Sequence, residues 1–185
     1  MIPLDDAVAE VLDACRELPS LWVPVGAAVG HALAENVRAA EPVPPFANSA
    51  MDGYAVRAAD IAGASPEQPV RLKVIGTVAA GHIPREPVRA GEAMRIMTGA
   101  LFPEGADTVA IVETTRTDGD HVVIDSPARR GEHVRGAGED IAAGSEVFAA
   151  GTVLGPGHVG VLCSVGREKA NVVALPRVGV LSTGD

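Results

Sequence analysis

The sequence predicts an α+β protein in which short, Val-rich strands outnumber helices. Apolar residues make up 47% of the 185 residues and aromatic residues only 3%, so a core must consist mainly of aliphatic side chains. Twenty-one Gly and fourteen Pro, spread without a fixed period, indicate many turns between short elements. Helical spacing of apolar residues is confined to a few stretches, two of them near the N-terminus.

The two N-terminal helical patterns precede a stiff extended segment. At residues 4–15, apolar side chains recur at three- and four-residue steps between acidic residues, which predicts an amphipathic helix. A second helix is expected at about residues 26–35, and the run "PVPPF" then predicts extended backbone. Cys15 and Cys163 have no CxxC spacing and are expected to be reduced, buried small hydrophobes.

From about Ser49 the pattern changes to short apolar runs separated by Gly, Pro or Asp, which predict strands. These runs are "GYAVRA", "VRLKVIGTVAA", "AMRIMTG", "DTVAIVE" and "HVVIDS". Asp118-Gly119 is a strong hairpin signal, so the segments before and after it are expected to pair antiparallel. This part of the chain is therefore expected to form a compact β-rich unit.

A mixed α and β pattern returns after "GEDIAAG". The strand-like "SEVFAAGTVL" precedes a helix expected at about residues 157–165, with Pro156 near its start, and then the strand "ANVVAL". The final "PRVGVLSTGD" predicts an apolar strand entering a polar loop, as phosphate-facing turns begin. Since a βαβ unit needs about 30 residues, we expect this chain to be the front part of a longer protein.

The charge balance restricts the partners. Fifteen basic and 24 acidic residues leave a formal charge of −9, which opposes binding to nucleic acid or to an anionic membrane. The sequence has no window of about 18 apolar residues and no basic signal peptide, which favours a cytoplasmic location. An anionic substrate would need a local basic site. Arg129, Arg130 and Arg135 could line one, or could belong to a solvated turn.

Three polar segments could carry chemistry: "NSAMDGYAV" at residues 48–56, "IMTGALFPEGADTV" with Thr98 and Asp107, and "GAGEDIAAG" with Glu139 and Asp140. Each also has a plain structural interpretation, as an Asp-Gly turn, a long hairpin connection and a solvated loop. Together they offer carboxylates and hydroxyls without Cys or closely spaced His, which suits Mg²⁺ better than zinc. The sequence contains no HExxH, GxSxG, P-loop or GxGxxG pattern.

At these segments the sequence closely resembles the molybdopterin molybdenumtransferases of the MoeA type, also found as the E domain of gephyrin. The stretches that carry the resemblance are "PPFANSAMDGYAV", "MRIMTGALFPEGADTVAIVE", "VRGAGEDIAAG" and "PRVGVLSTGD", in the family's order. The resemblance implies molybdenum cofactor biosynthesis by Mg²⁺-dependent insertion of molybdate into adenylylated molybdopterin, with release of AMP.

The resemblance also implies a multidomain fold. Residues 1–44 and 141–176 would form a discontinuous, mixed α/β linker and dimerisation domain, and residues 45–140 an inserted β-rich domain. Residues 177–185 would be the first strand of a third, pterin-binding α/β domain. A homodimer and an encounter with the upstream molybdopterin adenylyltransferase are implied. With its site between the second domain of one subunit and the third domain of its partner, this chain alone is expected to be inactive.

Carried over position by position, the resemblance implies catalytic roles for Asp52, Thr98 and Asp140. Asp52 and Asp140 would bind Mg²⁺ or position water, because bare carboxylates repel anionic molybdate and pterin phosphates. Thr98 would donate a hydrogen bond to an oxyanion. Substrate contacts are expected at Ser49, Ser182, Thr183, Gly184 and Asp185.

Two other interpretations remain open. The chain could be a dimerising scaffold or interaction module of the gephyrin type, without catalysis, and the sequence beyond Asp185 would separate this interpretation from the enzyme. A paralogue that handles tungstate or a different pterin step is the other. Metal content of the pterin product after incubation with molybdate or tungstate would identify it.

Overall fold

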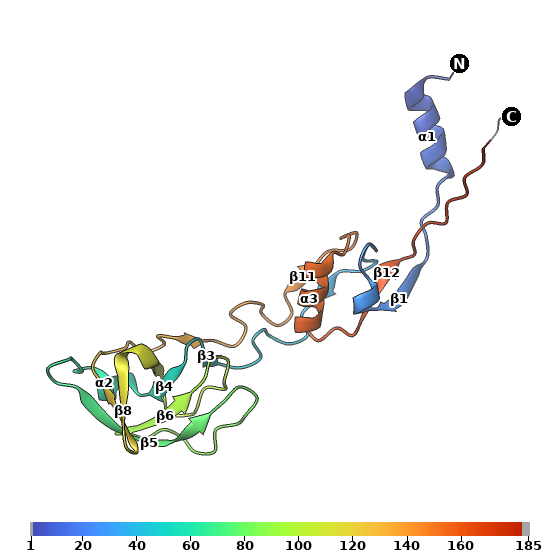
Figure 1. The fold of residues 1–185 in the computed structure, drawn as a ribbon. Helices are drawn as coiled ribbons and strands as arrows, with labels where there is room; N and C mark the ends of the chain where they lie inside the picture. Colours follow the sequence, from blue (N-terminus) through green and yellow to red (C-terminus); the bar gives the residue numbers. More distant parts are fainter. Residues whose placement is uncertain (1, 183–185) are drawn as a thin grey trace. The chain divides into compact units, whose positions relative to one another are not determined.

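The computed structural model describes residues 2–182, which divide into two compact units (Figure 1). Unit 1 comprises Met1–Ala40 and Ser145–Asp185, and unit 2 is Glu41–Gly144. The sequence placed the corresponding boundaries after residues 44 and 140, and the assignment of these units as functional domains stays a prediction. Among the described residues, no helix has the length and apolar character needed to cross a membrane.

Unit 1 contains two antiparallel strand pairs, two α-helices and a 3₁₀ turn. Strand β1 (Ser20–Pro24) pairs with β12 (Lys169–Val173), and β2 (Val37–Arg38) pairs with β11 (Glu146–Phe148). Helix α3 (Pro156–Ser164) confirms the predicted helix, and Pro156 occupies its first turn, where a missing N–H costs nothing. Leu162 of α3 packs into a core with Leu33, Leu154 and Val172.

Helix α1 (Leu4–Ala14) forms as predicted from its apolar spacing. None of its residues is buried, and Leu4, Val8, Val11 and Leu12 are exposed. The expectation of buried cysteines is wrong. Cys15 directly follows α1, which buries no residue, and Cys163 is the exposed neighbour of the buried Leu162 in α3. Both thiols are exposed and free.

The helix expected at residues 26–35 does not form. Only a short 3₁₀ turn, η1 (Val25–Ala27), is present, and Gly30 adopts a φ of 87°, which a right-handed helix cannot contain. The next residues are extended, since Ala32 and Leu33 form isolated bridges with Val153 and Val172. Ala28 and Leu33 of this stretch thus enter the core without helical structure.

The apolar strand predicted from "PRVGVLS" is also absent, because residues 174–182 contain neither helix nor strand. Val178, Val180 and Leu181 are exposed there. A β-strand requires a neighbour to receive its backbone hydrogen bonds, and none pairs with this stretch among the described residues. Apolar composition alone therefore did not determine its conformation.

Unit 2 contains a six-stranded sheet in the order β7-β4-β6-β5-β9-β8 (Figure 1). Its strands are β4 (Gly53–Val56), β5 (Val70–Val78), β6 (Glu92–Ile96), β7 (Thr108–Ile111), β8 (Thr115–Asp118) and β9 (His121–Ile124). The five predicted Val-rich runs and the hairpin at Asp118-Gly119 are confirmed. All neighbouring strands are antiparallel except β5 and β6, which run parallel.

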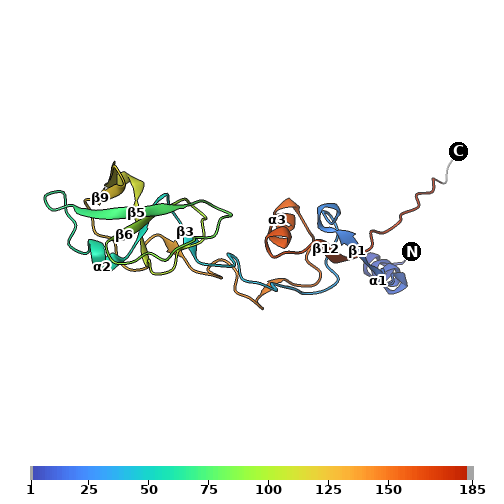
Figure 2. The same ribbon diagram turned by 90° about the horizontal axis from the view of Figure 1, so that it is seen from below.

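Four short elements complete unit 2. Helix α2 (Ala58–Ile61) lies against the sheet (Figure 2), where Ile61 joins Tyr54 and Val56 in one apolar cluster. A second cluster contains Ala55, so β4 contributes to both. The 3₁₀ turn η2 (Val112–Thr114) connects β7 to β8, and β3 (Asn48–Ser49) pairs with β10 (Val134–Arg135). The sheet holds the segment after β3 in a fixed place.

Candidate functional site

The parallel pairing of β5 and β6 brings three segments of unit 2 to one edge of the sheet. The carboxyl ends of these strands coincide, with Val78 opposite Ile96. Strand β4 is antiparallel to β6, with Gly53 opposite Ile96, so the residue before β4 reaches the same edge. Asp52 and Thr98 therefore meet although 46 residues separate them in sequence.

The carboxylate of Asp52 accepts two hydrogen bonds from Thr98. Oδ1 of Asp52 accepts a hydrogen bond from the backbone N–H of Thr98 at 2.7 Å and one from its hydroxyl at 2.8 Å. These bonds hold the pKa of Asp52 below its usual value, with the backbone hydrogen bond as the largest cause and the hydroxyl bond as the next. Desolvation raises the pKa in opposition, and the charge of Arg95 lowers it further. Oδ2 makes no hydrogen bond or ion pair with any residue from 2 to 182, and both side chains are exposed.

Backbone contacts fix the two turns that carry this pair. Val112 N–H donates to the Asp52 carbonyl, and Gly99 N–H donates to the Ser49 carbonyl at 2.8 Å. Gly99 has a φ of 76°, a conformation that favours glycine directly after Thr98. A Cβ at position 53 would overlap the carbonyl oxygen of Ala110, so a residue with a side chain would separate β4 from β7. The Asp-Gly turn and the Thr-Gly turn are thus the structural basis of the site.

Ser49, expected to contact substrate, has a different place in the structure. Its side chain is fully buried, and its hydroxyl donates to the carbonyl of Met51 at 2.5 Å while accepting from Met51 N–H at 3.3 Å. This local turn leaves the hydroxyl without exposure to a ligand. A contact between Ser49 and substrate stays a prediction.

Asp140 lies in a separate tight turn of unit 2. Its backbone N–H donates to Val43 at 3.0 Å, and the adjacent Glu139 accepts from Gly136 N–H at 2.9 Å. The Asp140 carboxylate is exposed and makes no hydrogen bond or ion pair with the described residues. Within residues 2–182, no group of three or more His, Cys, Asp or Glu side chains could hold a metal ion.

Of the remaining predicted contacts, Ser182 is exposed in an irregular segment of unit 1. Thr183, Gly184 and Asp185 lie outside the described residues. The structure therefore brings together Asp52 and Thr98 among the predicted site residues, and their roles stay predictions.

Arg95 is a neighbour of the site that sequence reasoning missed. Its guanidinium donates to the Tyr54 hydroxyl at 3.1 Å, and its Cζ lies 5.5 Å from the centroid of the Tyr54 ring. Arg95 is the cation that lowers the pKa of Asp52. The sequence pattern that could have identified it is a single Arg inside the apolar run "AMRIM". A strand without a function for the charge would favour a neutral residue at this position.

The basic residues nominated from sequence lie elsewhere in unit 2. Arg129 and Arg130 border a hollow of about 690 Å³ beside α2. Arg130 is 85% exposed and lies 3.6 Å from Asp107, whose other oxygen accepts from Ala58 N–H at 2.7 Å at the start of α2. Asp107 thereby accepts a hydrogen bond at the N-terminus of α2 and partly neutralises the charge of Arg130. Arg135 lies on β10.

Thr98→Val is expected to raise the pKa of Asp52 by removing the hydroxyl donor while retaining the backbone N–H. Because the remaining backbone bond is the larger cause, the pKa should stay below that of an unperturbed aspartate. A pH titration of the Asp52 carboxyl carbon by NMR measures this change. Thr98→Ser is the matched control and should leave the pKa near the wild-type value; an equal rise in both variants would contradict the role of the hydroxyl.

Comparison with known proteins identifies relatives of this chain. Residues 2–166 match a family described as the MoeA N-terminal region, domains I and II. Molybdopterin molybdenumtransferase 2 of Mycobacterium tuberculosis H37Rv is 42% identical over 177 residues, which cover 96% of this chain and 43% of the relative. The molybdopterin molybdenumtransferase of Staphylococcus aureus MSSA476 is 34% identical over 183 residues, covering 99% of this chain and 44% of that protein.

The structural comparison agrees. A crystal structure of a molybdopterin biosynthesis moeA protein from Pyrococcus horikoshii OT3 has a TM-score of 0.86 and 35% identity. The match covers 94% of this chain and 46% of that one. This chain thus spans less than half the length of the relatives it matches.

Proposed function

Because the chain belongs to the family of the MoeA N-terminal region, domains I and II, we propose that it contributes to molybdenum cofactor biosynthesis. The proposed reaction is Mg²⁺-dependent insertion of molybdate into adenylylated molybdopterin with release of AMP. The relatives' names support the substrate class. The observation that carries the proposal is the exposed Asp52 carboxylate, with one oxygen anchored by Thr98 and the other available.

Asp52 fits a role beside Mg²⁺. This ion commonly keeps several waters and takes only one or two protein carboxylates together with substrate phosphates. A site of this kind does not require the larger cluster that is absent among the described residues. When bound, the ion would neutralise charge on the anionic substrates. Asp140 is proposed as a second ligand.

The chain's own residues would act by holding charge and geometry. Thr98 directs its N–H and hydroxyl at one oxygen of Asp52, which keeps the carboxylate ionised and fixes its rotamer. The free oxygen can then accept a hydrogen bond from water, or from a metal-bound water, near the incoming oxyanion. Thr98 acts on Asp52 in this structure, and we propose that it contacts the oxyanion only after substrate arrives.

Reconstitution tests the proposed reaction. Adenylylated molybdopterin, molybdate and Mg²⁺ are incubated with the full-length protein that contains this sequence, and molybdenum in the pterin product and AMP are measured. We expect both products from the full-length protein and neither from the 185-residue chain alone. Tungstate in place of molybdate tests the alternative substrate. Failure of the full-length protein to release AMP with either oxyanion would overturn the proposal.

An assembly role is the second candidate, favoured by the exposed apolar side of α1. We expect the 185-residue chain to be a dimer in light-scattering measurements, and Val8→Glu to weaken that dimer by about tenfold because it places a charge on the apolar side. Glu10→Gln, on the polar side, is the control and should leave the dimer unchanged. A monomeric wild-type chain would remove support for this role.

A further inference from the structure

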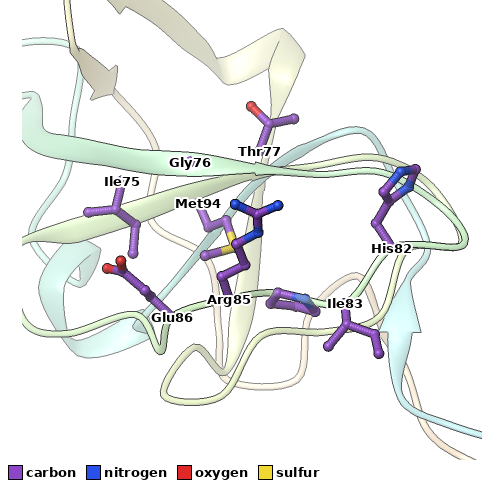
Figure 3. Close-up of a pocket in the computed structure, with 9 residues that line it drawn as sticks. Ile75, Gly76, Thr77, His82, Ile83, Arg85, Glu86 and Met94 are labelled. Atoms are coloured by element: carbon purple, nitrogen blue, oxygen red, sulfur yellow. The ribbon is translucent and has the colours of Figure 1, made fainter.

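Unit 2 contains a cavity of about 450 Å³ beside the parallel strands (Figure 3). Residues 75–77 of β5 and Met94 of β6 form one wall, and the returning segment of residues 82–86 forms the other. The cavity combines a buried thioether with an Arg, a His and a Glu. Its size suits a small ligand.

A β-bulge in β5 creates the open floor of this cavity. Val74 is opposite Ala93 and Gly76 opposite Met94, so Ile75 is an extra residue in β5. The bulge turns Ile75 and Gly76 toward the cavity, while Thr77 points away in Figure 3. A Cβ at Gly76 would meet nothing within 4 Å, so the missing side chain leaves unfilled space above Met94.

Arg85 supplies an unpaired cation to this space. Its guanidinium lies beside Gly76 in Figure 3 and makes no ion pair or hydrogen bond with any residue from 2 to 182. The ring of His82 also lines the cavity; its Nδ1–H donates to the Ala80 carbonyl at 3.3 Å, so Nε2 can donate to an oxyanion in the imidazolium form of the ring. In a chain with a net charge of −9, such a local cation is what an anion requires.

Glu86 lies at the other end of the cavity. Figure 3 shows its carboxylate on the side of Ile75, turned away from the guanidinium of Arg85, and the two groups form no ion pair. Glu104 borders a smaller hollow of about 270 Å³, which Arg85 and Glu86 also line. An anion is therefore favoured at the Gly76 end, and Glu86 opposes it from a distance.

The segment that lines the cavity leaves β5 at the edge that carries Asp52. The segment after β5 leaves the sheet where Met97 N–H donates to the Val78 carbonyl, one residue before Thr98. We propose that the cavity binds a tetrahedral oxyanion between Arg85 and His82, in the space left open at Gly76. Free molybdate and the phosphate of the adenylylated substrate share this chemistry, and assigning either one rests on the proposed function.

Binding measurements on the 185-residue chain test the inference. Molybdate is followed by equilibrium dialysis with metal analysis, and phosphate and AMP by ³¹P NMR. Arg85→Gln should weaken oxyanion binding by about tenfold or more, because a charge-assisted bidentate contact is lost. Glu86→Gln should tighten it by about threefold through loss of repulsion. Gly76→Val should abolish it by filling the space.

Arg116→Gln is the matched control, because Arg116 lies on β8 and outside the cavity lining. Equal loss of binding in Arg85→Gln and Arg116→Gln, or no loss in Arg85→Gln, would overturn the inference. The preferred anion identifies the source: tighter binding of molybdate indicates the free oxyanion, and tighter binding of AMP the substrate phosphate.

The same variants in the full-length protein separate this inference from the proposed function. If Arg85→Gln loses oxyanion binding but inserts molybdenum at the wild-type rate, assignment of the cavity to the reaction is wrong and the proposed function stands. If the wild-type protein inserts no molybdenum, the proposed function is wrong while the binding result is unaffected. A parallel loss of binding and of insertion supports both.

Discussion

Asp52→Asn in the full-length protein is expected to lower the rate of molybdenum insertion by about a hundredfold or more, the range typical of a lost acid–base or charge-positioning group. The amide oxygen of Asn can still accept both hydrogen bonds from Thr98, so the turn should keep its geometry. The negative charge is what disappears. Molybdenum in the pterin product and the rate of AMP release measure the effect.

Asp118→Asn is the control for this experiment. Asp118 is a half-exposed aspartate in the β8–β9 hairpin, paired with Arg71 at 3.1 Å, and it takes no part in the Asp52–Thr98 pair. Its replacement should leave the insertion rate near the wild-type value. An Asp52→Asn protein that retained full activity would refute a role for the Asp52 charge, whereas an equal loss in both variants would indicate a general effect of net charge.

The lowered pKa of Asp52 predicts the direction of the pH dependence. A carboxyl group whose folded-state pKa is depressed contributes stability above its unfolded pKa, and this contribution disappears as pH falls through the folded pKa. The same lowered pKa keeps Asp52 ionised at lower pH. Activity that needs ionised Asp52 should therefore persist to lower pH than an ordinary aspartate would allow. Thr98→Val should move the acidic limb of the rate profile to higher pH, and an unshifted limb would contradict this explanation.

Gly53→Ala is expected to destabilise unit 2 by about 3 kcal/mol, the upper range for overpacking in a filled core. The added Cβ would overlap the Ala110 carbonyl oxygen and lie 2.9 Å from Cγ1 of Val109. Both neighbours belong to β7, whose backbone pairs with β4, so neither can move aside as a flexible side chain would. Separation of these strands would also displace the adjacent Asp52.

Urea unfolding of the 185-residue chain, followed by circular dichroism and by amide exchange in β4 and β7, measures this loss. Gly76→Ala is the matched control: it adds the same methyl group to a strand glycine, but meets nothing within 4 Å. Its free energy of unfolding should stay within about 1 kcal/mol of wild type. Equal destabilisation by both substitutions would mean that replacing any strand glycine lowers the free energy of unfolding, and that the clash with Ala110 is not the cause.

Local patterns predicted the elements that local physics controls. The hairpin at Asp118-Gly119 formed because Gly119 tolerates its φ of 62° whatever surrounds it. The amphipathic spacing of α1 likewise produced a helix without any buried residue. At residues 26–35, by contrast, small apolar residues fitted either a helix or a buried extended segment, and pairing with Val153 and Val172 decided for the latter.

By itself, the sequence predicted the strands of the six-stranded sheet and the hairpin at Asp118-Gly119, and its motifs indicated the family and nominated Asp52 and Thr98. Only the tertiary structure decided that Thr98 binds Asp52, that Ser49 is buried, and that Arg85 faces the gap at Gly76. The physical reason is that periodicity reports which side chains need burial, whereas long-range pairing decides what covers them. The parallel contact of β5 with β6 is such a pairing, and it assembles the candidate site.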